Sequence, residues 1–489
     1  MKAFLTIFIA LSGLAIAAEP AHPNLLVFLV DDMGAMDTSV PFFQGDRPAG
    51  TPDLNHRYRT PNMEALAARG MKFMRAYAHP VCTPSRISIM TGKNAARHHV
   101  TNWTTPDGLD GNEKGSPNLR PPQDWLRTGM AATEKPLPAL LKAAGYQTIH
   151  CGKAHFGSKG AFAADPKAIG FEVNIAGSEI GHPASYSAKK DFGAGRNHVT
   201  GLEKWEGTDG FLTDVLTKEM CSAIETAAKS DKPFFAYMAH YAVHAPFEED
   251  PRFGANYQSL PRPEAAYASM IEGMDRSLGD ILAKLEQLGI AQNTFVIFLS
   301  DNGGDAPIAN DRAKPIISGN APLRGKKGMR YEGGLRVPLI AAWAKVDAEN
   351  NLQKELSVRP ASVTTDLVHV TDLFPTLLGM AGAKDIPAFD GHDLRPYLRG
   401  DADYHRPQWL VTHFPHAHNN EYFSVLHDGE WKFIRNYATD VDELYHLAVD
   451  PCELEDLAKK DPERAAAMKR ELERHLEEYG AQMPERVEK

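Results

Sequence analysis

Cys82 and Arg86 stand four residues apart in the segment Cys82-Thr83-Pro84-Ser85-Arg86, where a helix is predicted to begin. Proline suits the first turn of a helix, where its missing N–H costs nothing, and residues four apart share a helix face. A helix N-terminus with an arginine beside it binds anions. The same pattern also fits a buried or low-pKa cysteine beside an unrelated arginine. The segment therefore predicts either an anion site or a structural thiol, and the rest of the chain has to decide.

Polar side chains follow four separate predicted strands, at the point where each strand ends. These residues are Asp31 and Asp32, Lys153 and His155, His244, and Asp301 and Asn302. In open α/β sheets, ligands bind outside the carboxyl ends of the strands. We therefore expect these side chains to share one site.

Two of these strand ends offer only oxygen ligands, through Asp31, Asp32, Asp301 and Asn302. Oxygen ligands suit Ca²⁺ or Mg²⁺ and do not suit Zn²⁺ or Cu²⁺. Aspartates after strands also cap helices or form turns, and a single pair would favour that explanation. Two acidic strand ends in one sheet favour a metal site.

The other two strand ends offer cations and proton carriers. Lys153 and His155 are two apart on an extended segment, so they face the same side. A lone histidine is more often structural, but a lysine and two histidines beside a divalent cation and Arg86 suit an oxyanion whose leaving group must be protonated. Phosphate and sulfate esters both fit this description.

The elements that would position these groups alternate along the chain. Apolar strands are predicted at 24–30, 146–151, 233–239, 294–300 and 337–343, and helices at 61–69, after Cys82, and at 138–144, 211–229, 264–288 and 372–380. This pattern predicts an α/β fold with a large, mostly parallel central sheet and helices on both faces.

From about residue 408 the pattern changes to short strands at 409–412, 422–426 and 431–435, followed by a helix at 462–479. Asp428-Gly429 is a hairpin signal. We expect a catalytic domain at 19–400 and a small antiparallel α+β subdomain at 401–489.

Residues 1–18 have the pattern of a secretory signal peptide. Lys2 precedes an apolar run at 3–16, and the small-residue cleavage pattern Ala15-Ile16-Ala17 stands at the end of this region. The run is short for a membrane span, and an N-terminal core helix is the alternative. No second apolar stretch is long enough to cross a bilayer, so we expect a secreted or periplasmic protein.

The composition limits the kinds of ligand that the protein is expected to bind. The chain has 489 residues, 24% of them charged, and a net charge of -10, which argues against nucleic acid as a partner. A strongly anionic substrate would depend on local cations. Four cysteines make no disulfide framework, and one pairing among Cys151, Cys221 and Cys452 stays open.

The motif around Cys82, with Met90-Thr91-Gly92, resembles the signature of the type I sulfatases of the alkaline-phosphatase-like superfamily, in which the cysteine becomes formylglycine. Further segments resemble blocks of that family, in the family order: Leu29 to Asp32, Thr60 to Asn62, Gly152 to His155, His244 to Phe247, Ser300 to Gly303, Gly325 to Gly334 and Glu443 to Leu447. The resemblance covers nearly all of the mature chain and indicates a bacterial, secreted polysaccharide- or arylsulfatase-like member.

The resemblance implies a role for each matching residue. Asp31, Asp32, Asp301 and Asn302 would bind Ca²⁺, in preference to Mg²⁺, together with the modified Cys82. Arg86 would steady the formylglycine, Lys153 and Lys327 would hold the sulfate oxygens, and His155 and His244 would transfer protons. Lys326 competes with Lys327, but Lys327 directly precedes Gly328 and matches better. A formylglycine-generating maturation enzyme is an implied partner.

The substrate is predicted less narrowly, as a sulfated carbohydrate or another sulfate monoester. Trp103 and Trp125 could stack on sugar rings, or pack locally. A loop of the small subdomain carries His413, His416 and His418, which could contact the sugar or form a solvated turn; we expect only His413 to contact the substrate. Two alternatives are a phosphate or phosphonate ester hydrolase of the same superfamily, and a glycan-binding homologue without catalysis. A homologue without catalysis would lack one of the site residues, whereas this sequence has the expected residue at every position.

Overall fold

The computed structural model describes residues 22–48, 51, 53–109, 118–307, 319–401, 404 and 406–487. The predicted signal peptide at 1–18 lies outside the described residues. Within them, none of the helices combines the length and the apolar character that a membrane crossing requires.

The large sheet has nine strands in the order β10-β2-β9-β7-β1-β6-β4-β5, with β8 paired to β2. Their bounds are β1 (Asn24–Val30), β2 (Met71–Tyr77), β4 (Gln147–Gly152), β5 (Val173–Ile175), β6 (Phe234–Ala239), β7 (Thr294–Ser300), β8 (Arg336–Val337), β9 (Leu339–Trp343) and β10 (Ser362–His369). β7, β1, β6, β4 and β5 run parallel, whereas β9 is antiparallel to β7 and β2. The predicted fold class is confirmed.

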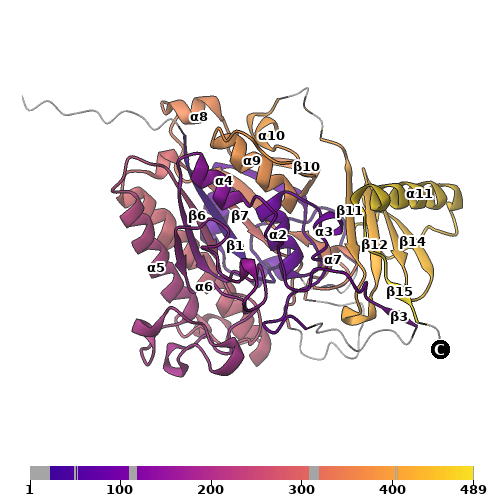
Figure 1. Cartoon of the computed structure of the whole chain (residues 1–489), viewed down its shortest axis with the longest axis horizontal. Helices are drawn as coiled ribbons and strands as arrows, with labels where there is room; N and C mark the ends of the chain where they lie inside the picture. The colour runs from indigo at the N-terminus through magenta and orange to yellow at the C-terminus, as the bar shows by residue number, and fades with distance from the viewer. Residues whose placement is uncertain are drawn as a thin grey trace, which may run out of the picture.

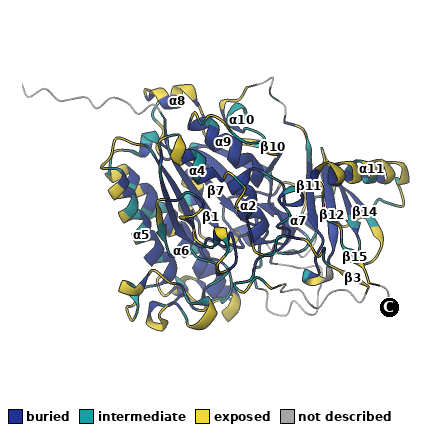
Figure 2. Cartoon of the chain, in the orientation of Figure 1, coloured by how far each residue is buried: buried dark blue, intermediate teal, exposed yellow. Residues whose placement is uncertain are grey.

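Helices cover both faces of this sheet because its central strands are apolar on both sides (Figures 1 and 2). Leu26 and Phe28 of β1 belong to one core cluster, whereas Leu25 and Val27 belong to the other. The first cluster is completed by α1 (Pro61–Arg69), α5 (Leu212–Ala227) and α6 (Arg262–Gln287), and the second by α2 (Cys82–Thr91), α4 (Leu137–Ala143) and α9 (Leu373–Met380). Shorter helices are α3 (Ala95–His98), α7 (Glu332–Leu335), α8 (Asn351–Glu355) and α10 (Arg395–Arg399).

The C-terminal part forms a second, four-stranded antiparallel sheet, which we call the small sheet (Figure 1). It consists of β11 (Trp409–Phe414), β12 (Phe423–Asp428), β13 (Trp431–Asn436) and β14 (Val441–His446), and α11 (Pro462–Tyr479) packs on it. Near the C-terminus, β15 (Glu485–Arg486) pairs with β3 (Leu119–Arg120). We propose that the boundary between the catalytic domain and the C-terminal subdomain lies near residue 400.

A buried cluster of charges joins the small sheet to the large one. Lys432 of β13 lies 3.0 Å from the Glu332 carboxylate and 2.7 Å from that of Glu453. His427 of β12 contacts the same Glu332 oxygen at 3.0 Å, and the hydroxyl of Tyr77 at the end of β2 donates to Glu332. Glu332 begins α7, directly after the loop that carries Lys327, so this cluster holds that loop against the small sheet.

Replacing Lys432 with methionine is expected to lower the free energy of unfolding by about 3–5 kcal/mol, because it leaves two buried carboxylates without their shared cation. Urea unfolding followed by circular dichroism would measure the change. Lys345→Met is the matched control, since Lys345 pairs with Glu286 on the surface and should change stability by about 0.5 kcal/mol or less. Equal losses in both variants would contradict the role given to the buried cluster.

Candidate active site

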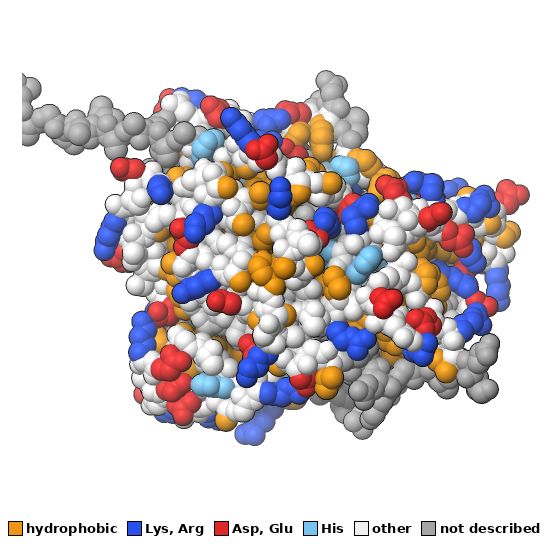
Figure 3. All heavy atoms as spheres, viewed as in Figure 1, with side chains coloured by type: hydrophobic (Ala, Val, Ile, Leu, Met, Phe, Trp, Pro, Cys, Tyr) orange, Lys and Arg blue, Asp and Glu red, His pale blue; other side chains and the backbone are white. Residues whose placement is uncertain are grey.

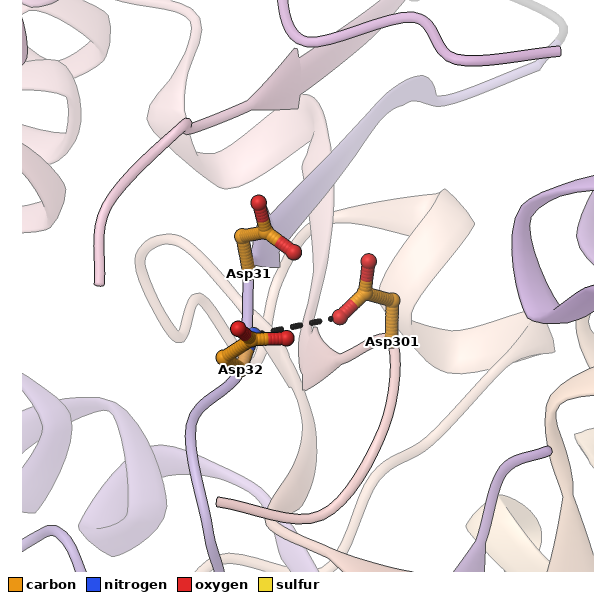
Figure 4. A group of neighbouring side chains, drawn as sticks. All are labelled: Asp31, Asp32 and Asp301. Atoms are coloured by element: carbon orange, nitrogen blue, oxygen red, sulfur yellow. Dashed lines mark hydrogen bonds between the residues drawn. The ribbon is translucent and has the colours of Figure 1, made fainter. Parts of the chain in front are cut away.

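Four neighbouring parallel strands bring the predicted site residues together. β7, β1, β6 and β4 are adjacent in the sheet, so their carboxyl ends meet at one edge. Asp31 and Asp32 follow β1 and Asp301 follows β7, and their carboxylate oxygens lie within 4.8 Å of one another (Figure 4). The backbone N–H of Asp32 donates to Asp301 Oδ1 at 3.2 Å, which ties the two strand ends together.

The arrangement of these oxygens fits a hard divalent cation such as Ca²⁺ or Mg²⁺. All three carboxylates are buried, and Asp31 Oδ1 and Asn302 Oδ1 are buried without a hydrogen bond within the described part of the chain. Asn302 turns its Nδ2 toward Asp32 Oδ1 at 2.8 Å, which leaves its carbonyl oxygen free to act as a ligand. Buried oxygen atoms without donors are the groups that a hard cation would satisfy.

The two aspartates that follow β1 have pKa values shifted in opposite directions. Burial raises the pKa of Asp31 well above its usual range, and the neighbouring Asp301 and Asp32 add to this effect against Lys153. Burial is the largest single effect on Asp32 and would raise its pKa, but Lys327, His244 and Lys153 together outweigh it and hold the pKa of Asp32 well below its usual range. The cluster therefore concentrates negative charge that nearby cations must offset.

Each carboxylate of the cluster is paired with its own cation. Lys153 Nζ lies 2.7 Å from Asp31, Lys327 Nζ lies 2.6 Å from Asp32, and Arg86 Nε lies 2.8 Å from Asp301. Arg86 also donates to the backbone oxygen of Lys153 at 2.8 Å, so it links β7 to β4.

Lys326 points elsewhere, because its ammonium pairs with Asp305 at 3.0 Å. Of the two competing lysines, only Lys327 joins the aspartate cluster.

Cys82 is the first residue of α2, and 4% of its surface is exposed. Its Sγ lies 3.4 Å from Nδ1 of His155, whose Nε2 is 2.7 Å from the backbone oxygen of Thr104. Since a carbonyl oxygen only accepts, Nε2 carries the proton and Nδ1 presents a lone pair to residue 82. Burial raises the pKa of the Cys82 thiol and lowers that of His155 well below its usual value, so both groups are neutral.

His244 follows β6 and faces the aspartate cluster. Its Nδ1 donates to the backbone oxygen of Ala245 at 2.7 Å, and its Nε2 lies 3.6 Å from Asp32. Burial and then the charge of Lys327 lower the pKa of His244 well below its usual value. The Nε2 atom is therefore the one that can exchange a proton with a ligand.

The ring of His182 stacks on the ring of His244, with centroids 5.2 Å apart and an angle of 5° between the planes. Its Nε2 lies 3.0 Å from Nδ2 of Asn197, and its Nδ1 lies 3.0 Å from the backbone oxygen of Pro183. The amide donates to Nε2 and the carbonyl accepts from Nδ1, so His182 is held neutral. His182 was not among the residues predicted from the sequence, although it follows the short strand β5 at the same edge of the sheet.

A cavity of about 540 Å³ opens beside Cys82, His155, His244 and Lys327. The small sheet contributes to it through His418, whose ring meets that of Trp103 edge-on at 4.7 Å. Trp103 lines the cavity and also packs against the core of the small sheet.

The loop that carries His418 also holds the Lys327 loop. Asn419, the next residue, donates from Nδ2 to the backbone oxygen of Lys327 at 3.1 Å. A Cβ at Gly328 would stand 2.0 Å from the His418 ring, so only glycine allows the two loops this contact.

The prediction for His413 is corrected by the structure. His413 lies inside β11, where its Nδ1 bonds to Ser424 Oγ at 2.7 Å and its Nε2 to the backbone oxygen of Gln482 at 2.9 Å. Both ring nitrogens are thus occupied away from the cavity. Trp125 packs against His416 at 4.9 Å, and the four cysteines, Cys82, Cys151, Cys221 and Cys452, are unpaired.

Two protein-family models and a set of known proteins match this chain. The sulfatase family model matches residues 23–383, and the model of the C-terminal part of N-sulphoglucosamine sulphohydrolase matches residues 325–482. The N-acetylgalactosamine-6-sulfatase of Mus musculus is 31% identical over 79% of this chain and 68% of its own length.

Solved structures show the same fold in enzymes of different specificity. The PsFucS1 sulfatase from Pseudoalteromonas sp. superposes with a TM-score of 0.65 at 22% identity, covering 95% of this chain and 92% of its own. The phosphonate monoester hydrolase of Agrobacterium radiobacter superposes with a TM-score of 0.61 at 18% identity, covering 96% of this chain and 100% of its own. The fold alone therefore does not separate the two ester classes.

Proposed function

Because the chain belongs to the sulfatase family, a family of sulfuric ester hydrolases, we propose that it releases sulfate from a sulfated carbohydrate through a formylglycine made from Cys82. The observation that supports this most is the placement of the buried Cys82 side chain, 3.4 Å from a neutral histidine and beside the aspartate cluster with its three cations. The carbohydrate is proposed because the Mus musculus relative is named for a sulfated amino sugar.

The thiol itself is poorly suited to attack sulfur. Burial raises the pKa of Cys82, so the reactive thiolate is disfavoured. A thiolate that did attack would leave a stable adduct with no easy exit. Conversion of Cys82 to an aldehyde by a formylglycine-generating maturation enzyme would remove both difficulties.

Asp31, Asp32, Asp301 and Asn302 would hold Ca²⁺ at this site. Bound Ca²⁺ would offset negative charge on the sulfate oxygens, and a hydrated formylglycine at position 82 would supply the hydroxyl that attacks sulfur in a two-step hydrolysis.

The remaining residues bind the ester and move protons. Lys153 and Lys327 orient the sulfate oxygens, while Arg86 keeps Asp301 in place. His155 accepts a proton at Nδ1 from the group at position 82, since its Nε2 is fixed by the Thr104 carbonyl. His244 gives a proton from Nε2 to the departing sugar oxygen.

The low pKa of His244 has to be reconciled with that role. After burial, Lys327 is the largest cause of the lowered pKa. A sulfate anion bound at Lys327 would offset this positive charge and favour the protonated imidazole. The proton would therefore be taken up together with the substrate.

Replacing His244 with glutamine is expected to lower kcat/KM for a sugar sulfate by about 10²–10³-fold, because an alkoxide leaves poorly without a proton. The loss on 4-nitrophenyl sulfate should be far smaller, since nitrophenolate leaves unaided. His182→Ala should show a weaker version of the same pattern, and His182→Phe, which keeps a ring against His244, should largely restore it. Equal losses on both esters would contradict the proposed acid.

Sulfate release measured by ion chromatography tests the function as a whole. Purified protein from a host with the maturation enzyme would be assayed in parallel on sulfated sugars and on the corresponding phosphate and phosphonate esters. We expect sulfate esters to be preferred. Preference for a phosphonate ester would favour the alternative hydrolase, and binding without turnover would favour the non-catalytic one.

The signal peptide proposed for residues 1–18 would direct the chain to the periplasm or the medium. A secreted location agrees with a polymeric substrate, because large sulfated polysaccharides are met outside the cytoplasm. Cleavage after export would be seen as a mature N-terminus near residue 19.

A further inference from the structure

The rim of the cavity carries an arginine that the proposed mechanism does not use. Arg196 lies in the 3₁₀ turn Gly195–Asn197 and lines the cavity that contains Cys82. Among the residues that the structure describes, it has one ion-pair partner, Asp107, at 3.6 Å. That distance is longer than a hydrogen bond, and 59% of the Arg196 side chain is exposed.

The other three cations of the site, which we call the inner cations, differ from Arg196 in their burial and in the distance to their carboxylate partners. Arg86 and Lys153 are fully buried, and Lys327 is nearly so. All three lie within 2.8 Å of a carboxylate of the aspartate cluster. The reacting sulfate is bound among these three under the proposed function. Arg196 is therefore placed for some other group of the ligand.

The partner of Arg196 leaves most of its guanidinium free. Asp107 uses Oδ1 to accept from Thr105 Oγ1 at 2.7 Å and from the N–H of Leu109 at 3.3 Å, so its own loop fixes it. The atom paired with Arg196 is the other oxygen, Oδ2, at 3.6 Å. A guanidinium has five donors in a rigid fork that matches a sulfate or carboxylate with two parallel hydrogen bonds.

Arg196 is also joined to the proposed acid through its neighbour in sequence. Asn197 bonds to His182, and His182 stacks on His244. A group held at Arg196 would thus lie on the segment that orients His244. The anchor would position the sugar against the residue that protonates it.

Because the net charge of the protein is negative, an anionic ligand has to be attracted by individual cations at the cavity. The chain carries a net charge of -10, and on the face shown in Figure 3 the basic and acidic side chains are interspersed. Long-range attraction therefore does not select for polyanions, and discrimination has to come from individual cations at the cavity.

We propose that Arg196 binds a second anionic group of the substrate, a sulfate or carboxylate other than the one that is cleaved. The preferred substrate is then a saccharide with at least two anionic groups. This inference rests on the proposed function, since it takes the inner cations to hold the reacting sulfate.

Matched sugars that differ by one sulfate test the inference. The pairs are N-acetylgalactosamine 6-sulfate with its 4,6-disulfate, galactose 6-sulfate with its 2,6-disulfate, and glucosamine 6-O-sulfate with its 2-N,6-O-disulfate. Affinity is measured by titration calorimetry on the Cys82→Ala protein, and turnover by sulfate release from the active enzyme. In at least one pair, the doubly sulfated member should be preferred on the order of tenfold or more.

Three substitutions at the rim give opposite expectations. Arg196→Gln should reduce the preference to about twofold or less, and Arg196→Lys should keep part of it because a point charge replaces the fork. Asp107→Asn removes the competing carboxylate and should increase the preference. The opposite signs of two changes at one ion pair exclude a general loss of folding as the cause.

Several results would overturn the inference. They are an unchanged preference in Arg196→Gln, a decrease in Asp107→Asn, and equal or absent binding of both members in all three pairs. Failure of the proposed function looks different. The wild-type enzyme would then release no sulfate from any sugar or from 4-nitrophenyl sulfate, while the calorimetric comparison on Cys82→Ala would still report on Arg196.

Discussion

Replacing Cys82 with alanine is expected to lower kcat/KM for sulfate release by ~10⁴-fold or more, because it removes the precursor of the proposed nucleophile. The fold should persist. Cys82 is a small side chain, and the ion pairs of Arg86, Lys153 and Lys327 with the aspartates do not involve it. Sulfate release and the melting temperature would be measured on the same preparation.

Cys221→Ala is the matched control for this change. Cys221 lies on α5 and packs against the first core cluster, away from the site, so its loss should leave sulfate release unchanged. Mass spectrometry of the Cys82 peptide from the native host should show the aldehyde. An unmodified thiol in fully active enzyme, or full activity in Cys82→Ala, would contradict the proposed chemistry.

The same reasoning applies to wild-type protein made without a maturation enzyme. It should fold like the active form, since Cys82 is buried by the surrounding chain and not by the modification. Its sulfate release should match that of the alanine variant. Folding and activity are thus separable in this protein.

Replacing Asp301 with asparagine is expected to abolish calcium binding and to lower kcat/KM by ~10³-fold, through lost charge stabilisation in the transition state. The substitution keeps the shape of the side chain but removes one of three clustered negative charges. It also leaves Arg86, which lies 2.8 Å from Asp301, without its closest charged partner.

Thermal unfolding with and without Ca²⁺ gives a readout that does not depend on turnover. A ligand at 100 times its Kd stabilises the folded state by about 2.7 kcal/mol. Wild-type protein should therefore melt a few degrees higher in calcium than in chelator, and Asp301→Asn should not.

Asp275→Asn serves as the control because Asp275 is another buried carboxylate. It accepts from the backbone N–H groups of Asn62 and Met63 at the start of α1 and lies outside the aspartate cluster. This variant is expected to lose some stability but to keep the calcium-dependent increase in melting temperature. If Asp301→Asn also kept that increase, the metal site would have to be placed elsewhere.

Most central elements could be predicted from the sequence because their signals are local. The strand at 24–30 and the strand at 294–300 are continuous apolar runs, and the structure has them with the same bounds. The helix at 61–69 also begins and ends as predicted.

The strands that were missed lack such a run. β2 is interrupted by Lys72 and Arg75, and β10 begins with alternating half-buried and exposed residues that are polar except for Val363. Both are recognisable as strands only through their pairing in the sheet, which a single sequence does not show.

Three residues that were missed at the site share one cause. His182, Arg196 and His418 come from loops, and the path of a loop depends on what it packs against. His413 was expected at the substrate because it was assigned, with His416 and His418, to a loop that could reach the pocket. It belongs to a strand, however, and its side chain bonds within the small sheet and to Gln482.

The sequence by itself determined which kinds of side chain gather at the site, through oxygen ligands and cations at strand ends and a cysteine at a helix start. Parallel strands carry their carboxyl ends to one edge, so those residues had to meet. Only the tertiary structure decided which cation pairs with which aspartate, that His182 stacks on His244, and that Arg196 lies at the rim with Asp107 as its distant partner. These contacts join segments far apart in the chain, and their geometry follows from packing, which no local pattern encodes.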